Sequence, residues 1–266
     1  MKRLPLVLLA AVLGCAWVGC GKVPPNPPAN AALLRVAAAS DLQFALEEII
    51  RDFEQNLPSV KVKPTYGSSG NLFAQLQQGA PFDVFLSADV KLPRLLERSG
   101  RAEAGSTFIY GIGRIAVWVP SASPINVEAE GIRALLHPSV RKIAIANPAH
   151  APYGAAAEAA LKHFGVYDQL AGSLVLGENV VQAAQFIESG AAEIGVIAFS
   201  LATSPKLRAA GRFWLVPLEA FPRLEQGGVV ISGSRQTESA RRFAASLTEP
   251  SGRAILERHG FLLPRD

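Results

Sequence analysis

The chain has 266 residues, of which 49% are hydrophobic and 18% are charged, with 26 basic and 22 acidic side chains. No basic run interrupts this near balance, so the charge pattern of a nucleic-acid-binding protein is missing. Both cysteines, Cys15 and Cys20, lie close to the N-terminus, so the rest of the chain has no disulfide.

Residues 1–20 have the pattern of a bacterial export signal. Lys2 and Arg3 precede an uncharged stretch of about 15 apolar residues, whereas a membrane-spanning helix needs ~20. Cys15 and Cys20 each follow an apolar-x-Gly sequence that resembles a lipoprotein signal. We expect Cys20 to be lipidated, because it leaves a signal of ordinary length; Cys15 and a plain secretory signal are the alternatives. The expected protein is exported, periplasmic and membrane-anchored rather than membrane-spanning.

Residues 21–32 (GKVPPNPPANAA) form a predicted linker, because their prolines favour an extended chain without a core. The ~234 residues that follow are enough for two compact lobes.

From residue 33 onward, apolar stretches of strand length alternate with stretches of helical periodicity. The predicted strands are 33–39, 60–66, 83–87, 114–119, 142–146, 174–176, 194–199, 213–217 and 229–232. The predicted helices are 42–57, 71–78, 90–99, 154–164, 180–189, 235–247 and 251–258. Pro64 favours an edge position for the second strand. The alternation predicts an α/β fold with mostly parallel sheets; the pattern alone leaves two lobes, one large sheet and a barrel open.

A recurring junction carries the information about function: a strand ends, small or polar residues follow, and a helix begins. It occurs at 39–41, 67–71, 152–154 and 177–180. In parallel sheets such junctions share the carboxyl edge, where ligands bind. Each helix start offers unpaired N–H groups and partial positive charge, so several together predict an anion site without lysine or arginine.

Each junction taken singly also fits simple helix capping. Ser40 with Gln43 has the spacing of a capping box, and Asn179 with Gln182 has the same spacing. The run 67–71 (GSSGN) has more small donors than a cap requires, but it lacks the lysine of a nucleotide-binding phosphate loop.

An enzymatic function is not expected from the residues. The four histidines are scattered without zinc-ligand spacing, and no G-x-S-x-G elbow occurs. A hydrolase that pairs a junction serine with His150 remains an alternative, which requires the two side chains to lie within hydrogen-bonding reach. His150 bonded to loop backbone is the simpler interpretation.

Several stretches together resemble the periplasmic molybdate-binding proteins of ABC transporters, the ModA family. They are AAASDL at 37–42, YGSSGNLFAQLQQGAPFDVFLSAD at 66–89, IANPAHAPYGAAAEAAL at 145–161, GENVVQA at 177–183 and GRAILERHGF at 252–261. They follow one another in order over nearly all of the chain after the linker.

The resemblance implies a two-lobed, type II periplasmic binding protein fold, in which each lobe is a mostly parallel sheet flanked by helices. Lobe 1 would comprise 33–112 and 222–266, lobe 2 would comprise 113–221, and the ligand would lie in the cleft between them. It also implies the substrate-binding component of an ABC importer, a monomer that binds molybdate or tungstate without a cofactor. Its partner would be an ABC permease in the inner membrane.

The family's ligand contacts fall on four positions. The two hydroxyl contacts fall on Ser40 and Ser69, and the two backbone amide contacts fall on Tyr153 and Val180. These residues would hold the molybdate oxygens, with no direct ligand to the metal.

One family contact has no counterpart here. A tyrosine hydroxyl that binds the anion in part of the family falls on Ala198, which has no donor. The Tyr153 hydroxyl or the backbone amide of Asp41 would replace it. We expect the Asp41 carboxylate to cap a helix and face away from the anion; an inward carboxylate would instead favour a protonated ligand such as phosphate. A receptor for sulfate or another oxyanion is the second alternative.

Overall fold

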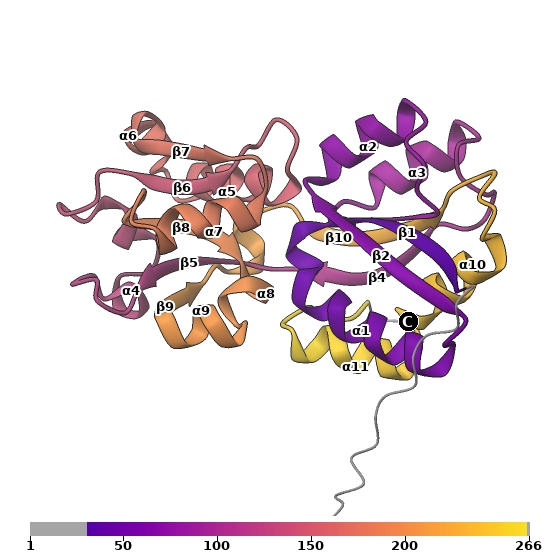
Figure 1. Cartoon of the computed structure of the whole chain (residues 1–266). Helices are drawn as coiled ribbons and strands as arrows, with labels where there is room; N and C mark the ends of the chain where they lie inside the picture. Colours follow the sequence, from indigo (N-terminus) through magenta and orange to yellow (C-terminus); the bar gives the residue numbers. More distant parts are fainter. Residues whose placement is uncertain (1–30, 265–266) are drawn as a thin grey trace, which may run out of the picture.

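The computed structural model describes residues 31–264, so the predicted signal, both cysteines and most of the predicted linker lie outside the described residues. The chain forms two five-stranded sheets, each with its own helices, which lie side by side as two lobes (Figure 1). No helix within residues 31–264 combines the length and apolar character needed to cross a membrane.

The sheet of lobe 1 has the order β2-β1-β3-β10-β4. Its strands are β1 (Ala32–Ala39), β2 (Val60–Gly67), β3 (Val84–Ser87), β4 (Phe108–Gly113) and β10 (Leu224–Val230). β1 runs parallel to β2 and β3, whereas β10 runs antiparallel to β3 and β4. Four strands therefore point the same way and β10 is reversed. β2 is an edge strand, as Pro64 predicts.

Side chains alternate along β1 between two layers of helices. Leu34, Val36 and Ala38 pack with one hydrophobic cluster, and Ala37 packs with the other. The first cluster is covered by α1 (Gln43–Asn56), α10 (Thr237–Ser246) and α11 (Pro250–Arg258), and the second by α2 (Ser69–Gln77) and α3 (Lys91–Arg98). Each large apolar side chain buried this way contributes about 1.5–3 kcal/mol, which fixes the register of the strand.

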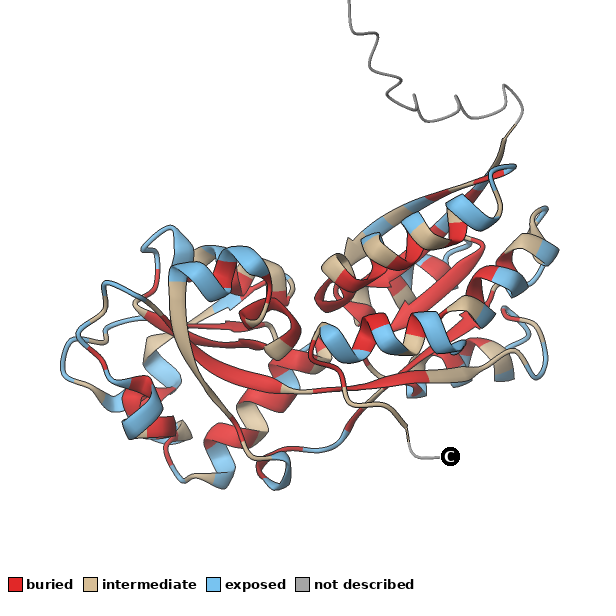
Figure 2. Cartoon of the chain, turned by 90° about the horizontal axis from the view of Figure 1, so that it is seen from below, coloured by how far each residue is buried: buried red, intermediate tan, exposed pale blue. Residues whose placement is uncertain are grey.

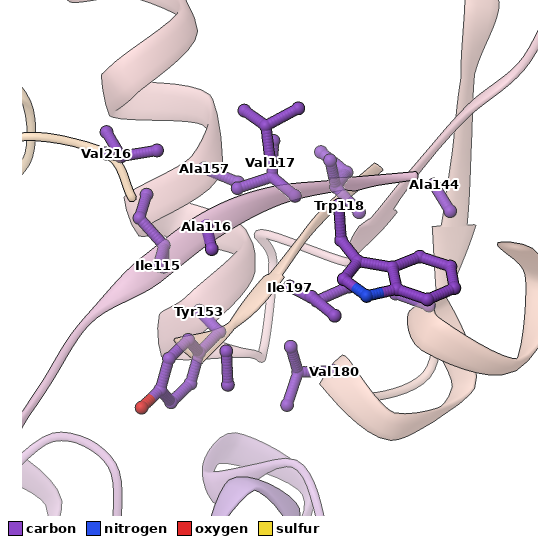
Figure 3. Close-up of a cluster of buried hydrophobic side chains, with 14 of the residues drawn as sticks. Ile115, Ala116, Val117, Trp118, Ala144, Tyr153, Ala157, Val180, Ile197 and Val216 are labelled. Carbon is purple, nitrogen blue, oxygen red and sulfur yellow. The ribbon is translucent and has the colours of Figure 1, made fainter. Parts of the chain in front are cut away.

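The sheet of lobe 2 repeats this plan in the order β7-β6-β8-β5-β9. Its strands are β5 (Ile115–Pro120), β6 (Ile143–Ala146), β7 (Leu174–Gly177), β8 (Ile194–Ala198) and β9 (Gly211–Leu215). β6 runs parallel to β7 and β8, and β5 runs antiparallel to β8 and β9. Trp118 and its apolar neighbours fill the core of this lobe (Figure 3).

The helices of lobe 2 are mostly short. They are α4 (Val127–Glu130), α5 (Pro152–His163), α6 (Tyr167–Leu170), α7 (Val180–Glu188), α8 (Phe199–Ala202) and α9 (Pro205–Ala210). Exposed residues lie on the outer faces of the helices, and the strands at the centre of each lobe are buried (Figure 2).

The chain crosses between the lobes twice. It leaves lobe 1 at the end of β4 and enters lobe 2 at the start of β5, with Arg114 between them. It returns between β9 and β10 through the short helical turn Leu218–Ala220. The Arg114 guanidinium donates hydrogen bonds to the Gly260 carbonyl at 3.0 and 2.8 Å and lies over the Phe199 ring, so the first crossing is tied to both lobes.

The sequence pattern did not predict β4 or residues 224–228 of β10. Both are rich in glycine, which weakens the strand signal. In β10 the glycines permit close packing: a Cβ added at Gly227 would lie 2.5 Å from the Val90 side chain, and one at Gly228 would lie 2.5 Å from Phe108.

Candidate functional site

A small cavity lies where helix starts from both lobes meet. From lobe 1 come the 3₁₀ helix Ser40–Leu42 after β1 and the start of α2 after β2. From lobe 2 come the starts of α5 and α7, which follow β6 and β7. The residues that line it are Ala39, Ser40, Asp41, Gly67, Ser68, Ser69, Ala88, Ala151, Pro152, Tyr153, Asn179 and Val180. The structure thus brings Ser40, Ser69, Tyr153 and Val180 to one cavity.

Ser40 does not cap a helix, so the simpler alternative of a capping box with Gln43 is excluded. A 3₁₀ turn separates β1 from α1, and neither helix start has a side-chain cap. The Ser40 side chain is buried, with 4% exposure, and its hydroxyl forms no hydrogen bond with another group in residues 31–264. This hydroxyl is therefore a donor without a protein acceptor at the cavity.

Ser68 and Ser69 have different roles at the start of α2, which begins two residues earlier than predicted. Ser68 is the N-cap, and its Oγ accepts the Asn71 N–H at 3.4 Å. The Ser69 Oγ accepts the Ala88 N–H at 2.9 Å. Because the Ser69 oxygen is already an acceptor, its proton remains available to a ligand in the cavity.

The backbone of α5 presents the Tyr153 N–H. Pro152 precedes it without an N–H, and the N-cap Ala151 has no side-chain acceptor. Gly154 allows the helix start to approach β6, because a Cβ there would lie 2.7 Å from the Ala146 carbonyl carbon. Figure 3 shows Tyr153 and Val180 at the side of the lobe 2 core that faces lobe 1.

The start of α7 presents the Val180 N–H. The Asn179 side-chain oxygen accepts the N–H groups of Val181 and Gln182 at 3.0 and 3.1 Å. Gln182 in turn accepts the Glu178 N–H at 2.6 Å. These capping bonds satisfy the next two amides of the first turn and leave Val180 facing the cavity.

Asp41 does not cap a helix either, which corrects the prediction for its carboxylate. Its Oδ2 accepts the Tyr153 hydroxyl at 2.9 Å and the Gln226 side-chain amide at 2.7 Å. The single Tyr153 proton is therefore directed to Asp41 and is not the replacement donor that we considered for Ala198. Burial raises the pKa of the Asp41 carboxyl to about 6, although hydrogen bonds from Gln226, Tyr153 and its own backbone N–H lower it.

Ala198 itself is fully buried at the end of β8 and pairs with Ile115. The nearby Ser200 hydroxyl donates to the Asp41 carbonyl at 2.9 Å, so it is not a substitute donor. Sequence reasoning missed Gln226, Tyr110 and Ser200 near the site, because nothing local in the sequence links them to Asp41.

Further contacts between the lobes close the rim of the cavity. The Gly70 N–H donates to the His150 carbonyl at 2.9 Å, and the Asn71 side chain donates to the Glu178 carboxylate at 2.9 Å. Ala39 and Ala88 of lobe 1 join the hydrophobic cluster of lobe 2. The structure therefore describes the closed arrangement of the lobes.

The hydrolase alternative required a serine and a histidine within reach, and such a pair exists: Ser68 Oγ lies 3.0 Å from His150 Nδ1. A Ser–His nucleophile also needs a group that orients the base. No carboxylate contacts the His150 ring in the described part of the chain. Ser68 already caps α2, and the pair joins the two lobes beside the other rim contacts. It therefore fits a contact of the closed state.

A wider groove of ≈ 750 Å³ lies at the opposite edge of the lobe 1 sheet, where Arg35, Arg101 and Arg235 are among its lining residues. It belongs to lobe 1 alone, so a ligand there would not contact both lobes. The smaller cavity is the one that lobe closure shapes.

Two α/β lobes that enclose a cavity at the meeting point of their helix starts define a two-lobed binding protein. Residues 34–262 match the family model "Bacterial extracellular solute-binding protein". The chain belongs to this family and, within it, to the ModA proteins. It is 32% identical to the molybdate-binding protein ModA of Azotobacter vinelandii over 98% of this chain and 97% of that protein.

Solved structures agree with this assignment. The periplasmic molybdate-binding protein of Azotobacter vinelandii superposes with a TM-score of 0.81 at 31% identity, covering 87% of this chain and 100% of that one. The sulfate-binding protein SubI of Mycobacterium tuberculosis has a TM-score of 0.69 at 15% identity, covering 86% of each chain, and shares the fold alone. The predicted fold class, a two-lobed periplasmic binding protein, is confirmed.

Proposed function

We propose that this protein captures molybdate, or the closely similar tungstate, outside the cytoplasm and delivers it to an ABC permease of the inner membrane. The observation that carries the proposal is that Ser40, Ser69, Tyr153 and Val180 line one cavity between the lobes. The two serine hydroxyls and the two backbone amides would be the hydrogen-bond donors. The molybdate-binding relatives over nearly the whole chain support the choice of ligand.

The chemistry of this donor set fits a fully deprotonated dianion. No lysine or arginine among residues 31–264 lines the cavity, so the positive potential there comes from helix starts and hydroxyl dipoles. Hydrogen bonds to a charged partner contribute about 1.5–3 kcal/mol each. Several such bonds together contribute more free energy than closing the lobes and ordering the side chains cost.

Selection against sulfate would depend on size. A closed cavity matched to the longer Mo–O bonds leaves a smaller tetrahedral ion short of some donors, and each unpaired donor costs about 1–3 kcal/mol. Tungstate is nearly the same size as molybdate, so both should bind.

One observation favours a second candidate, an oxyanion that carries a proton. Asp41 lines the cavity, and its Oδ1 is buried without a hydrogen-bond partner among residues 31–264. A protonated ligand such as hydrogen phosphate would bring a donor for a carboxylate there. The same anion panel distinguishes the two candidates.

The test is a thermal-shift panel of molybdate, tungstate, sulfate, phosphate and chromate on the purified protein. A ligand at one hundred times its Kd adds about 2.7 kcal/mol to the free energy of unfolding. For a chain of this size we expect the melting temperature to rise by about 5–10 °C. We expect that rise with molybdate and tungstate; a rise with phosphate or sulfate alone would reject the proposal.

We also propose that the protein is exported as a lipoprotein monomer, with Cys20 as the lipidated residue and Cys15 as the alternative. The two lipobox-like sequences and the proline-rich segment before β1 support this proposal. Mass spectrometry of the membrane-extracted protein should find the lipid on Cys20. An unmodified protein that begins at another residue would contradict it.

A further inference from the structure

A buried hydrogen-bond cluster joins the lobes directly beside the cavity. The Tyr153 hydroxyl of lobe 2 reaches across the interface to Asp41 Oδ2 of lobe 1. The Gln226 amide donates to the same oxygen and also to the Tyr153 hydroxyl oxygen at 2.9 Å. The Tyr110 hydroxyl lies 3.0 Å from both the Gln226 side-chain oxygen and the Ser87 carbonyl oxygen, so its one proton is shared between these two acceptors. All four side chains are at most 4% exposed, so Asp41 is the central acceptor of a buried interface.

The two oxygens of the Asp41 carboxyl are not equivalent. Oδ2 accepts hydrogen bonds from two side chains, whereas Oδ1 is buried and accepts none from any other residue of the described chain. A buried acceptor without a donor is costly, and a buried charge is more so. Since Oδ2 is already satisfied, a proton on this carboxyl would reside on Oδ1.

No cation within residues 31–264 pairs with Asp41 to offset its charge. The groups that face it are neutral: Tyr153 from α5, Tyr110 and Gln226 from β4 and β10, and Ser200 from α8 at its backbone carbonyl. Burial and the Asp41 charge raise the pKa of both tyrosines, which keeps them protonated. Burial lowers the pKa of Arg114, which interacts electrostatically with Tyr153 and donates a hydrogen bond to the Gly260 carbonyl.

We propose that Asp41 takes up one proton on Oδ1 as the lobes close on the anion, so that the protein captures an oxyanion and a proton together. This inference rests on the proposed function, because the anion in the adjacent cavity carries the negative charge that would repel an ionised Asp41. The neutral carboxyl still accepts from Tyr153 and Gln226 through Oδ2, and it no longer repels a dianion.

The direction of the pH dependence follows from the pKa values. We expect opening of the lobes to expose Asp41 and return its pKa toward the ordinary aspartate value of 3.8, whereas burial raises it to about 6 in the closed form. Between these two pKa values the closed form binds more protons than the open form. A fall in pH through this window therefore favours the closed form over the open form. A dianion beside the carboxyl raises its pKa further and extends the window above pH 6.

The experiment is isothermal titration calorimetry of molybdate binding between pH 6.0 and 7.5, in buffers of different ionisation enthalpy. We expect the wild-type protein to take up between about one half and one proton per anion at pH 6.0. We also expect at least a twofold gain in affinity from pH 7.5 to 6.0. Asp41→Asn should bind without this proton uptake, because an amide cannot titrate. Any proton that the anion itself exchanges appears equally in this variant and is subtracted.

Two further variants make the result specific. Tyr153→Phe keeps the backbone amide at the cavity but removes a hydrogen bond that favours the charged carboxylate, so proton uptake should extend to higher pH. Asp168→Asn, on the exposed surface of α6, should behave as the wild type. Wild-type binding without proton uptake, or equal uptake in Asp41→Asn, would overturn the inference alone. If the wild type binds no molybdate at all, the proposed function and this inference fail together.

Discussion

Two serines that look alike in the sequence have different tasks in the fold. The Ser40 hydroxyl has no protein partner in the described chain, whereas Ser69 supports the Ala88 amide through its oxygen. Replacing either one removes a donor from the cavity. Replacing Ser69 also leaves a buried N–H without an acceptor.

We therefore predict that Ser40→Ala and Ser69→Ala each weaken molybdate binding at least tenfold, or about 1.4 kcal/mol, as measured by calorimetry. Only Ser69→Ala should also lower the free energy of unfolding of the ligand-free protein, by about 1–3 kcal/mol. Ser189→Ala, on the exposed end of α7, is the matched control and should change neither quantity. Unchanged affinity in both cavity variants would exclude these hydroxyls from the site.

At the residue scale, the sequence predicted the cavity residues better than the network beside them. Ser40, Ser69, Tyr153 and Val180 stand at strand–helix junctions, and parallel strands bring such junctions to one sheet edge. The cluster around Asp41 could not be predicted, because it pairs residues 112 and 185 positions apart. Such pairings depend on how the two lobes meet.

Among the elements, α7 shows how a cap can orient a binding group. Asn179 occupies the second and third amides of the helix and leaves the first one facing the cavity. Asn179→Ala should lower the free energy of unfolding by about 1 kcal/mol. It should also weaken molybdate binding severalfold, because the Val180 amide is no longer held in place.

The control for this variant is Asn126→Ala. Asn126 caps α4 through the Ala129 N–H and does not line the cavity. The free energy of unfolding of Asn126→Ala, measured by chemical denaturation, should fall by the same amount as in Asn179→Ala or by less. Its affinity for molybdate should equal that of the wild type. Equal affinity in both variants would show that the cap has no part in binding.

The element predictions succeeded where periodicity was strong and failed where glycine or very short helices occur. The strands of the parallel portion, such as β1 and β6, appear within one or two residues of their predicted positions. β4 contains two glycines, and α4, α6 and α8 have four residues each, too few to show a helical period. These segments form because tertiary packing holds them.

For the whole molecule, lobe closure depends on one close backbone approach. A Cβ added at Gly70 would lie 2.6 Å from the His150 carbonyl oxygen of the opposite lobe. Gly70→Ala should therefore weaken molybdate binding at least tenfold, or about 1.4 kcal/mol. Because alanine favours a helix over glycine by up to about 1 kcal/mol, the ligand-free protein should be as stable as the wild type or more so.

Weaker binding together with unchanged or higher stability would distinguish an effect on lobe closure from an effect on folding. Calorimetry measures the affinity, and thermal unfolding without ligand measures the stability. Gly172→Ala is the control, since a Cβ there meets no atom within 4 Å, and it should bind as the wild type does. A Gly70→Ala protein with full affinity would show that the closed contacts at the rim are not required.

The reversed strand of lobe 1 has a consequence for how the molecule is assembled. β10 lies between β3 and β4, yet it comes from the far end of the chain, more than a hundred residues after β4. The second sheet can be completed from one continuous stretch, whereas the first must wait for β10 before its central ladder closes. Nascent chains that have not yet produced this strand leave β3 and β4 without their shared neighbour. The folding of lobe 1 is thereby delayed until nearly the whole polypeptide is available.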